Sequence, residues 1–203
     1  MDEFYRKALL LEYFTVGYNI IEAFVSILFG AAANSIALIG FGLDSIVESL
    51  SGCVLIWRLY KHGTLSEEQE EKVEKRAQRF VAITFFVLGA YVLVQSIRKL
   101  LIQEIPDPSL PGIVIAIVSL IVMPVLSAQK LKIGNAISSK ALIADSKETL
   151  ACAFLSVALL LGLSLNYLFG FWQADAIAGI VIVIFLVREG IENWRESFEK
   201  QND

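Results

Sequence analysis

Four long stretches of this sequence contain no Asp, Glu, Lys or Arg: Ala23–Leu43, Phe80–Ile97, Pro108–Gln129 and Thr149–Ala174. A helix needs about 20 mostly apolar residues to cross the hydrocarbon of a membrane, so each stretch can supply most of a span. Over the whole chain 56% of the residues are hydrophobic and 19% are charged, whereas soluble domains are about one quarter charged. The sequence therefore predicts an all-α integral membrane protein.

Single acidic residues interrupt the remaining apolar segments, and we predict six transmembrane helices in total. Their expected bounds are Leu9–Ala31, Ser35–Tyr60, Arg79–Leu101, Leu110–Leu126, Ser139–Leu165 and Ala174–Gly190. Pro124 should kink or end the fourth helix, because proline removes a backbone donor. Six spans leave no room for a sizeable soluble domain, so we expect residues 1–203 to form one transmembrane domain.

Charge supplies the expected orientation and excludes one class of partner. Most Lys and Arg residues fall at the two termini, in a charged connection over about residues 61–78 and between the fourth and fifth helices. Basic residues favour the cytoplasmic side, so both termini should be cytoplasmic. The net charge of −4 argues against a nucleic-acid partner. The expected location is a bacterial cytoplasmic membrane.

Five acidic residues stand at apparent membrane depth: Glu22, Asp44, Glu48, Asp145 and Glu148. Charged side chains are costly in hydrocarbon, so each of them is a candidate functional residue. Asp44 and Glu48 are four residues apart and share one helix face. Asp44 should lie about 14 Å from the start of its helix, near the middle of the bilayer.

An internal repeat connects this pair with a second one. When the sequence is aligned with itself at one constant offset, Ser35 falls on Ser139, Asp44 on Glu148 and Glu48 on Cys152. Each half, about residues 9–101 and 110–190, has three helices, and an odd number makes the second copy enter from the opposite side. We therefore predict two inverted three-helix repeats, with the binding site between them near the midplane.

Four residues on two facing helices could close a tetrahedral metal site: Asp44, Glu48, Glu148 and Cys152. Three carboxylates and one thiolate suit Zn²⁺ better than Mg²⁺, which prefers six oxygen ligands. Fe²⁺, Mn²⁺, Co²⁺ and Cd²⁺ remain alternatives. A buried cysteine is often only a small apolar residue, so Cys152 is either a ligand or part of the core.

The other polar residues at membrane depth allow several interpretations. Asp145 could cap its helix, pair with Lys147 or line the route by which the ion reaches the site, and Glu22 could support a ligand or pair with Lys147. Lys147 is the cation expected among these acids. It directly precedes Glu148 in the helix, so its side chain should point away from the ion. We expect Cys53 to lie in the core and Asp175 to cap the sixth helix.

Two segments resemble the cation diffusion facilitator family of metal/proton antiporters. The stretch Ser35–Glu48 is similar to the second-helix motif of that family, and Ala144–Cys152 is similar to its fifth-helix motif. The family usually has His or Asp at the position of Glu148 and Asp at that of Cys152. The resemblance implies a short form without the cytoplasmic metal-binding domain, and a homodimer.

These features favour a secondary transporter that exports a divalent metal in exchange for protons, without a resident cofactor. Crowded carboxylates hold protons when the site is empty, and a dication displaces them because its ligands must be deprotonated. One alternative is an intramembrane aspartyl protease that uses Asp44 and Asp145. Another is an accessory subunit that binds metal without transporting it.

Overall fold

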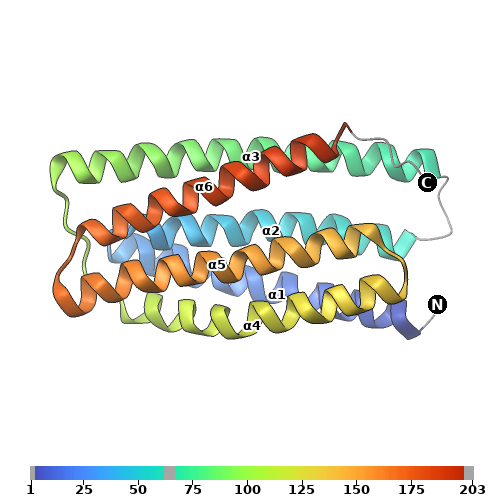
Figure 1. Ribbon diagram of the computed structural model, residues 1–203, viewed down its shortest axis with the longest axis horizontal. Helices are drawn as coiled ribbons and strands as arrows, with labels where there is room; N and C mark the ends of the chain where they lie inside the picture. Colours follow the sequence, from blue (N-terminus) through green and yellow to red (C-terminus); the bar gives the residue numbers. More distant parts are fainter. Residues whose placement is uncertain (1–2, 62–66, 199–203) are drawn as a thin grey trace.

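A computed structural model describes residues 3–61 and 67–198 of the chain, and this part is all α-helical with six helices (Figure 1). The helices are α1 (Glu3–Ala32), α2 (Ile36–Lys61), α3 (Glu67–Ile102), α4 (Leu110–Ala136), α5 (Lys140–Phe169) and α6 (Gln173–Glu196). The predicted number of helices is confirmed, whereas the prediction that all six cross a membrane stays a prediction. Five helices, α1 to α5, are long and apolar enough to cross a membrane by length and composition.

Two helices extend well beyond their expected bounds. α3 begins at Glu67, inside the predicted connection over residues 61–78, whereas His62 lies outside the described residues. The predicted end of α4 near Leu126 is wrong, because the helix continues through Pro124 to Ala136. Proline removes one hydrogen bond from the helix. α4 packs along α5, and this packing keeps α4 helical in spite of that loss.

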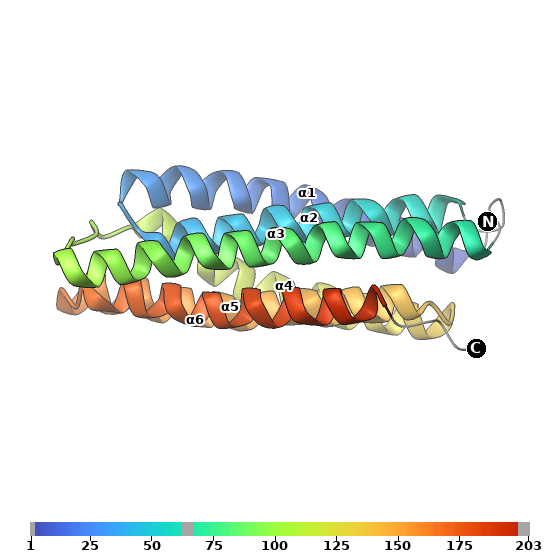
Figure 2. The same cartoon turned by 90° about the horizontal axis from the view of Figure 1, so that it is seen from above.

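The two halves of the chain run in opposite directions. α1, α3 and α5 run one way and α2, α4 and α6 the other, so α1 is antiparallel to α4, α2 to α5 and α3 to α6 (Figure 1). α1 begins and α6 ends at the same end of the bundle. α1 packs on α2, α4 on α5 and α3 on α6 (Figure 2).

The α1–α2 and α4–α5 corners are built alike. Asn34 and Ser138 both have φ 52°, and the next residue in each corner is a serine that directly precedes a helix. The hydroxyl of Ser35 accepts the Leu38 amide at 3.1 Å, and that of Ser139 accepts the Leu142 amide at 3.3 Å. A serine that accepts an amide in the first turn is a standard N-cap.

A glycine allows the backbones to meet closely at each of these corners. A Cβ on Gly30 would lie 2.9 Å from the amide nitrogen of Ile39, and one on Gly134 would lie 3.2 Å from that of Ile143. The same small residue is thus needed at matching places in both halves. Equal turns, caps and close approaches in the two corners match the predicted repeat.

The inside of the bundle combines apolar core clusters with buried charged side chains, and its outside is largely apolar. Large apolar side chains such as Leu10 (73% exposed) and Phe24 (67%) cover the outer surface, whereas Glu12, Glu22 and Lys130 are completely buried. A surface of this kind suits lipid and not water. The prediction that Cys53 lies in the core is wrong: it is exposed, because five residues rotate it by roughly 140° from Glu48 around α2.

Candidate metal centre

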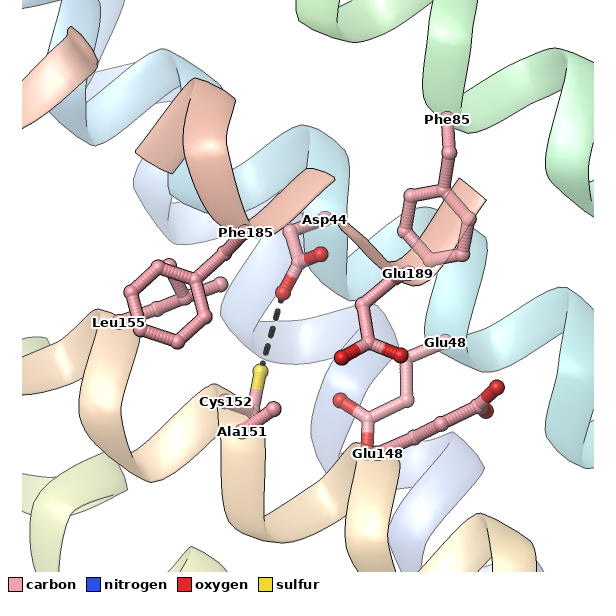
Figure 3. Close-up of a pocket in the computed structure, with 9 residues that line it drawn as sticks. All are labelled: Asp44, Glu48, Phe85, Glu148, Ala151, Cys152, Leu155, Phe185 and Glu189. Carbon is pink, nitrogen blue, oxygen red and sulfur yellow. Dashed lines mark hydrogen bonds between the residues drawn. The ribbon is translucent and has the colours of Figure 1, made fainter. Parts of the chain in front are cut away.

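A pocket lies between α2, α3, α5 and α6 and contains all four predicted metal ligands (Figure 3). Its lining residues are Asp44, Glu48, Phe85, Glu148, Ala151, Cys152, Leu155, Phe185 and Glu189. The helical repeat accounts for this convergence, because residues four apart on α2 and on α5 share one face. The aromatic and aliphatic side chains keep the acidic groups in an apolar setting.

Asp44 and Cys152 are in direct contact across the pocket. The Cys152 thiol donates a hydrogen bond of 3.1 Å to a carboxylate oxygen of Asp44, drawn as the dashed line in Figure 3. Both side chains are buried. Cys152 also packs beside Met123, Leu126 and Ala153, so it contacts both the pocket and the apolar core.

Glu148 has different partners. One carboxylate oxygen accepts a hydrogen bond of 3.0 Å from the Asn193 amide on α6, and the other accepts one of 3.2 Å from the Ser51 hydroxyl on α2. Figure 3 shows the carboxylate pointing away from the Asp44–Cys152 pair. Glu148 would therefore have to rotate toward Cys152 to share a metal ion with it.

Glu48 has a buried carboxylate, and neither of its oxygens has a hydrogen-bond partner among the described residues. Buried polar atoms of this kind are rare and costly. Over the part of the chain that the structure describes, three or more His, Cys, Asp or Glu side chains nowhere come close enough to hold a metal ion. The four predicted ligands thus share a pocket without forming a closed coordination sphere.

Glu189 adds an acidic group that the sequence reasoning missed. It lies on α6 and lines the same pocket. The sequence signal was the spacing of Glu189 and Asn193, which stand four residues apart and so share a face, as Asp44 and Glu48 do. Asn193 donates to Glu148, so this face of α6 completes the polar side of the pocket.

Asp145 belongs to a separate buried cluster. Its carboxylate lies 2.5 Å from the ammonium of Lys130, which is also 3.3 Å from Glu12 and 3.2 Å from the Thr149 hydroxyl. Lys130 was expected in the loop between the fourth and fifth helices and is instead buried inside α4. Lys147, predicted as the cation among the acids, is exposed and does not line the pocket.

Glu22 is held by hydroxyl groups and not by a cation. It accepts hydrogen bonds from Ser45, at 2.8 Å, and from Ser119, and Ser119 shares a further hydrogen bond of 2.8 Å with Tyr18. The alternative in which Glu22 pairs with Lys147 is wrong, because Glu22 is completely buried and Lys147 is exposed.

Asp175 caps a helix other than its own. Its carboxylate accepts hydrogen bonds from the hydroxyl of Ser35 and from the amide of Ile36, at 2.9 Å, so it caps the start of α2. Trp172 occupies the N-cap position of α6. The predicted cap for the sixth helix is therefore wrong, because the tertiary fold brings the beginnings of α2 and α6 together.

The geometry does not suit an aspartyl protease, whose two carboxylates share one proton. Asp44 is bonded to Cys152, whereas Asp145 is paired with Lys130. A buried group of acidic side chains and a thiol in one pocket suits the binding of a soft or borderline cation better.

Comparison with known proteins agrees with this chemistry. The sequence matches the cation efflux transmembrane domain family over residues 13–200, and that family consists of transporters and not of enzymes. It is 23% identical to transmembrane protein 163 of Xenopus laevis over 188 residues, 92% of this chain and 66% of that protein. It is 26% identical to an uncharacterized transporter of Methanocaldococcus jannaschii over 177 residues, 84% of this chain and 61% of that protein. The chain thus spans less than two thirds of the length of either relative.

Proposed function

This chain belongs to the cation efflux transmembrane domain family, and from this premise we propose that it exports a divalent transition metal in exchange for protons. Zn²⁺ is the favoured substrate, with Fe²⁺, Mn²⁺, Co²⁺ and Cd²⁺ as alternatives. The observation that carries the proposal is the buried carboxylate of Glu48, which has no hydrogen-bond partner among the described residues in a pocket shared with Asp44 and Cys152. Such a group needs a proton or a cation.

The proposed ligands are Asp44, Glu48, Glu148 and Cys152. Carboxylate oxygens bind zinc at about 2.0–2.2 Å and a thiolate binds it at about 2.3 Å, so a closed site requires the side chains to draw together. Cys152 would give up its proton, and Glu148 would leave Asn193 and Ser51 for the ion. The thiolate makes the site softer than one built from oxygen alone.

Exchange with protons follows from the charges of these ligands. In the empty pocket the buried acidic groups are neutralised by protons, and a dication displaces those protons when it binds. When the pocket opens to the opposite side, protons return and release the metal. The two opposed halves, related through their matching corners, are the elements expected to move relative to one another in alternating access.

The setting of this activity is also part of the proposal. Both termini face the cytoplasm of a bacterial cell, all six helices cross its cytoplasmic membrane as two inverted repeats, and two copies form a homodimer. The basic residues near the start of α1 and the end of α6 support this orientation. Residues 1–203 act as one transmembrane domain.

Metal uptake into liposomes containing the purified protein tests the proposal. An outward-directed proton gradient should drive zinc into vesicles with the native protein. Asp44→Asn, which removes one pocket charge without changing its size, should abolish this uptake, while Asp107→Asn, at an exposed loop position, should leave it unchanged. Uptake at the native rate by Asp44→Asn would exclude the proposed site.

The same experiment addresses the accessory-subunit alternative. A subunit that only holds metal would bind zinc in calorimetry and yet accumulate none in the vesicles. Binding together with gradient-driven uptake excludes this alternative.

A further inference from the structure

A line of polar residues occupies the middle of the buried face of α1. Its residues are Glu12, Thr15, Asn19, Glu22 and Ser26, spaced alternately three and four apart, and each is at most 2% exposed. This spacing places them in one line on the helix. They extend over about 21 Å, most of the hydrocarbon thickness of a bilayer. We call them the α1 polar face.

Several atoms of this face have no hydrogen-bond partner among the described residues. Both amide atoms of Asn19 are buried without one, and so is the hydroxyl of Ser26. Buried polar groups in folded proteins are nearly always paired with protein or with ordered water. The need is greater inside a membrane, where lipid offers no partner.

Polar groups from α2 and α4 lie opposite the α1 polar face. Lys130 contacts Glu12 near the start of α1, while Ser119 and Ser45 hold Glu22 further along. Asn19 lies between these two paired regions. Pro124 lies between Ser119 and Lys130 on α4 and has no amide hydrogen, so the Leu120 carbonyl lacks its helical donor.

We propose that the α1 polar face binds a file of water molecules that conducts protons between Glu12 and Glu22, at a site distinct from the four metal ligands. Asn19 holds the central water, because its amide both donates and accepts. Each water accepts a proton from one neighbour and passes another on, so one proton enters as one leaves and the file returns to its starting composition. This inference rests on the proposed proton antiport.

The position of Glu22 explains how the file would serve the metal pocket. Its carboxylate accepts a hydrogen bond of 2.8 Å from Ser45, and Ser45 directly follows Asp44 in α2. A proton delivered at Glu22 is therefore close to the carboxylates that the departing metal leaves behind. Ser45 lies about 100° around α2 from Asp44, so protons would arrive from a different side of this helix than the metal.

The decisive variant is Asn19→Leu, which keeps the branched shape of the side chain but removes both hydrogen-bonding atoms. It should lower gradient-driven zinc uptake by about tenfold, equivalent to about 1.4 kcal/mol in the barrier. Zinc affinity measured by calorimetry at fixed pH should stay within about twofold of the native value, because the metal ligands are unchanged. Asn19→Ser, which can still bind water, should retain most of the rate.

Ile20→Leu is the matched control, since Ile20 is the next residue on α1 and is 57% exposed on the outer surface. It should transport at the native rate. Asn19→Leu transporting as fast as Ile20→Leu would overturn the proposal. If the native protein itself shows no gradient-driven uptake, the proposed antiport fails instead, so the two failures are distinguishable.

A measurement on the native protein avoids any dependence on how a variant folds. Hydroxyl radicals generated from bound water in lipid nanodiscs should label Tyr18, which is bonded to Ser119 beside the file. Tyr91, 44% exposed on the outer surface of α3, is the lipid-facing comparison and should be labelled weakly. Equal, weak labelling of both tyrosines would show a dry interface and refute the water file.

Discussion

The thiol of Cys152 donates a hydrogen bond of 3.1 Å to the carboxylate of Asp44, joining α5 to α2 across the pocket. The two residues come from opposite halves of the chain but do not occupy equivalent positions, since the repeat relates Asp44 to Glu148 and Cys152 to Glu48. Because α2 and α5 are antiparallel, the first acid of the α2 pair, Asp44, lies opposite the second residue of the α5 pair, Cys152. This diagonal contact is thus what an inverted repeat produces.

This contact makes Cys152 the most informative residue to change. Cys152→Ala should weaken zinc binding by about tenfold or more, because it removes one of four proposed ligands. Cys152→Asp should keep zinc transport and weaken any preference for cadmium, since oxygen is a harder ligand than sulfur. Calorimetry and vesicle uptake with both metals measure these effects. Cys53→Ala, at the exposed cysteine, is the control. If Cys152→Ala binds zinc as tightly as Cys53→Ala does, Cys152 is not a ligand.

Glu189 should contribute negative charge to the pocket without being one of the four ligands. Glu189→Gln is expected to lower zinc affinity by severalfold, because the site loses attraction for a dication in a region poorly screened by water. Glu192→Gln removes an exposed acid from the same helix and should have no effect. Binding isotherms at low ionic strength make the comparison, and equal affinities in both variants would place Glu189 outside the site.

Zinc affinity should rise with pH. Protons and the metal compete for the same ligands, so low pH favours the protonated site, and the apparent affinity increases by about tenfold per pH unit for each proton displaced. The slope should flatten once the ligands have lost their protons. Calorimetry in buffers of different ionisation enthalpy counts the protons released. A binding heat that does not depend on the buffer would contradict proton exchange.

Lys130 should be important for stability because it neutralises two buried acids. Lys130→Met leaves Glu12 and Asp145 together without a cation, and breaking a buried ion pair in this way costs about 3–5 kcal/mol. Lys132→Met, on the exposed side of α4, should cost little. Thermal unfolding in detergent gives both values. Equal stability of the two variants would show that the cluster contributes nothing to folding.

Asp175 should stabilise the start of α2 from a neighbouring helix. Asp175→Ala removes the acceptor for the Ser35 hydroxyl and the Ile36 amide, and loss of a helix cap costs about 1–2 kcal/mol. A lower unfolding temperature in detergent is the expected result. Hydrogen exchange of the Ile36 amide gives a local check, because that amide should lose protection if Asp175 is its acceptor.

Hydropathy and spacing were sufficient for the six helices and for the positions of the metal candidates. Uncharged runs of this length have no stable alternative to a helix in lipid, and residues four apart on a helix must share a face. Asp44 and Glu48 were therefore predictable as one pair, and Glu148 and Cys152 as the other. The inverted relation between the halves followed from the odd number of helices in each.

The partners of individual charges depended on the tertiary structure. Nothing near Lys130 in the sequence distinguished a loop lysine from a buried one, because its acidic partners stand on α1 and α5. Asp175 likewise meets α2 only because the bundle closes. Spacing along one helix fixes which face a side chain occupies, but the packing between helices decides whether that face meets lipid, a counter-charge or the pocket. Hydropathy therefore determined the spans, and only the packed bundle determined which buried charges neutralise one another and which remain for a metal ion.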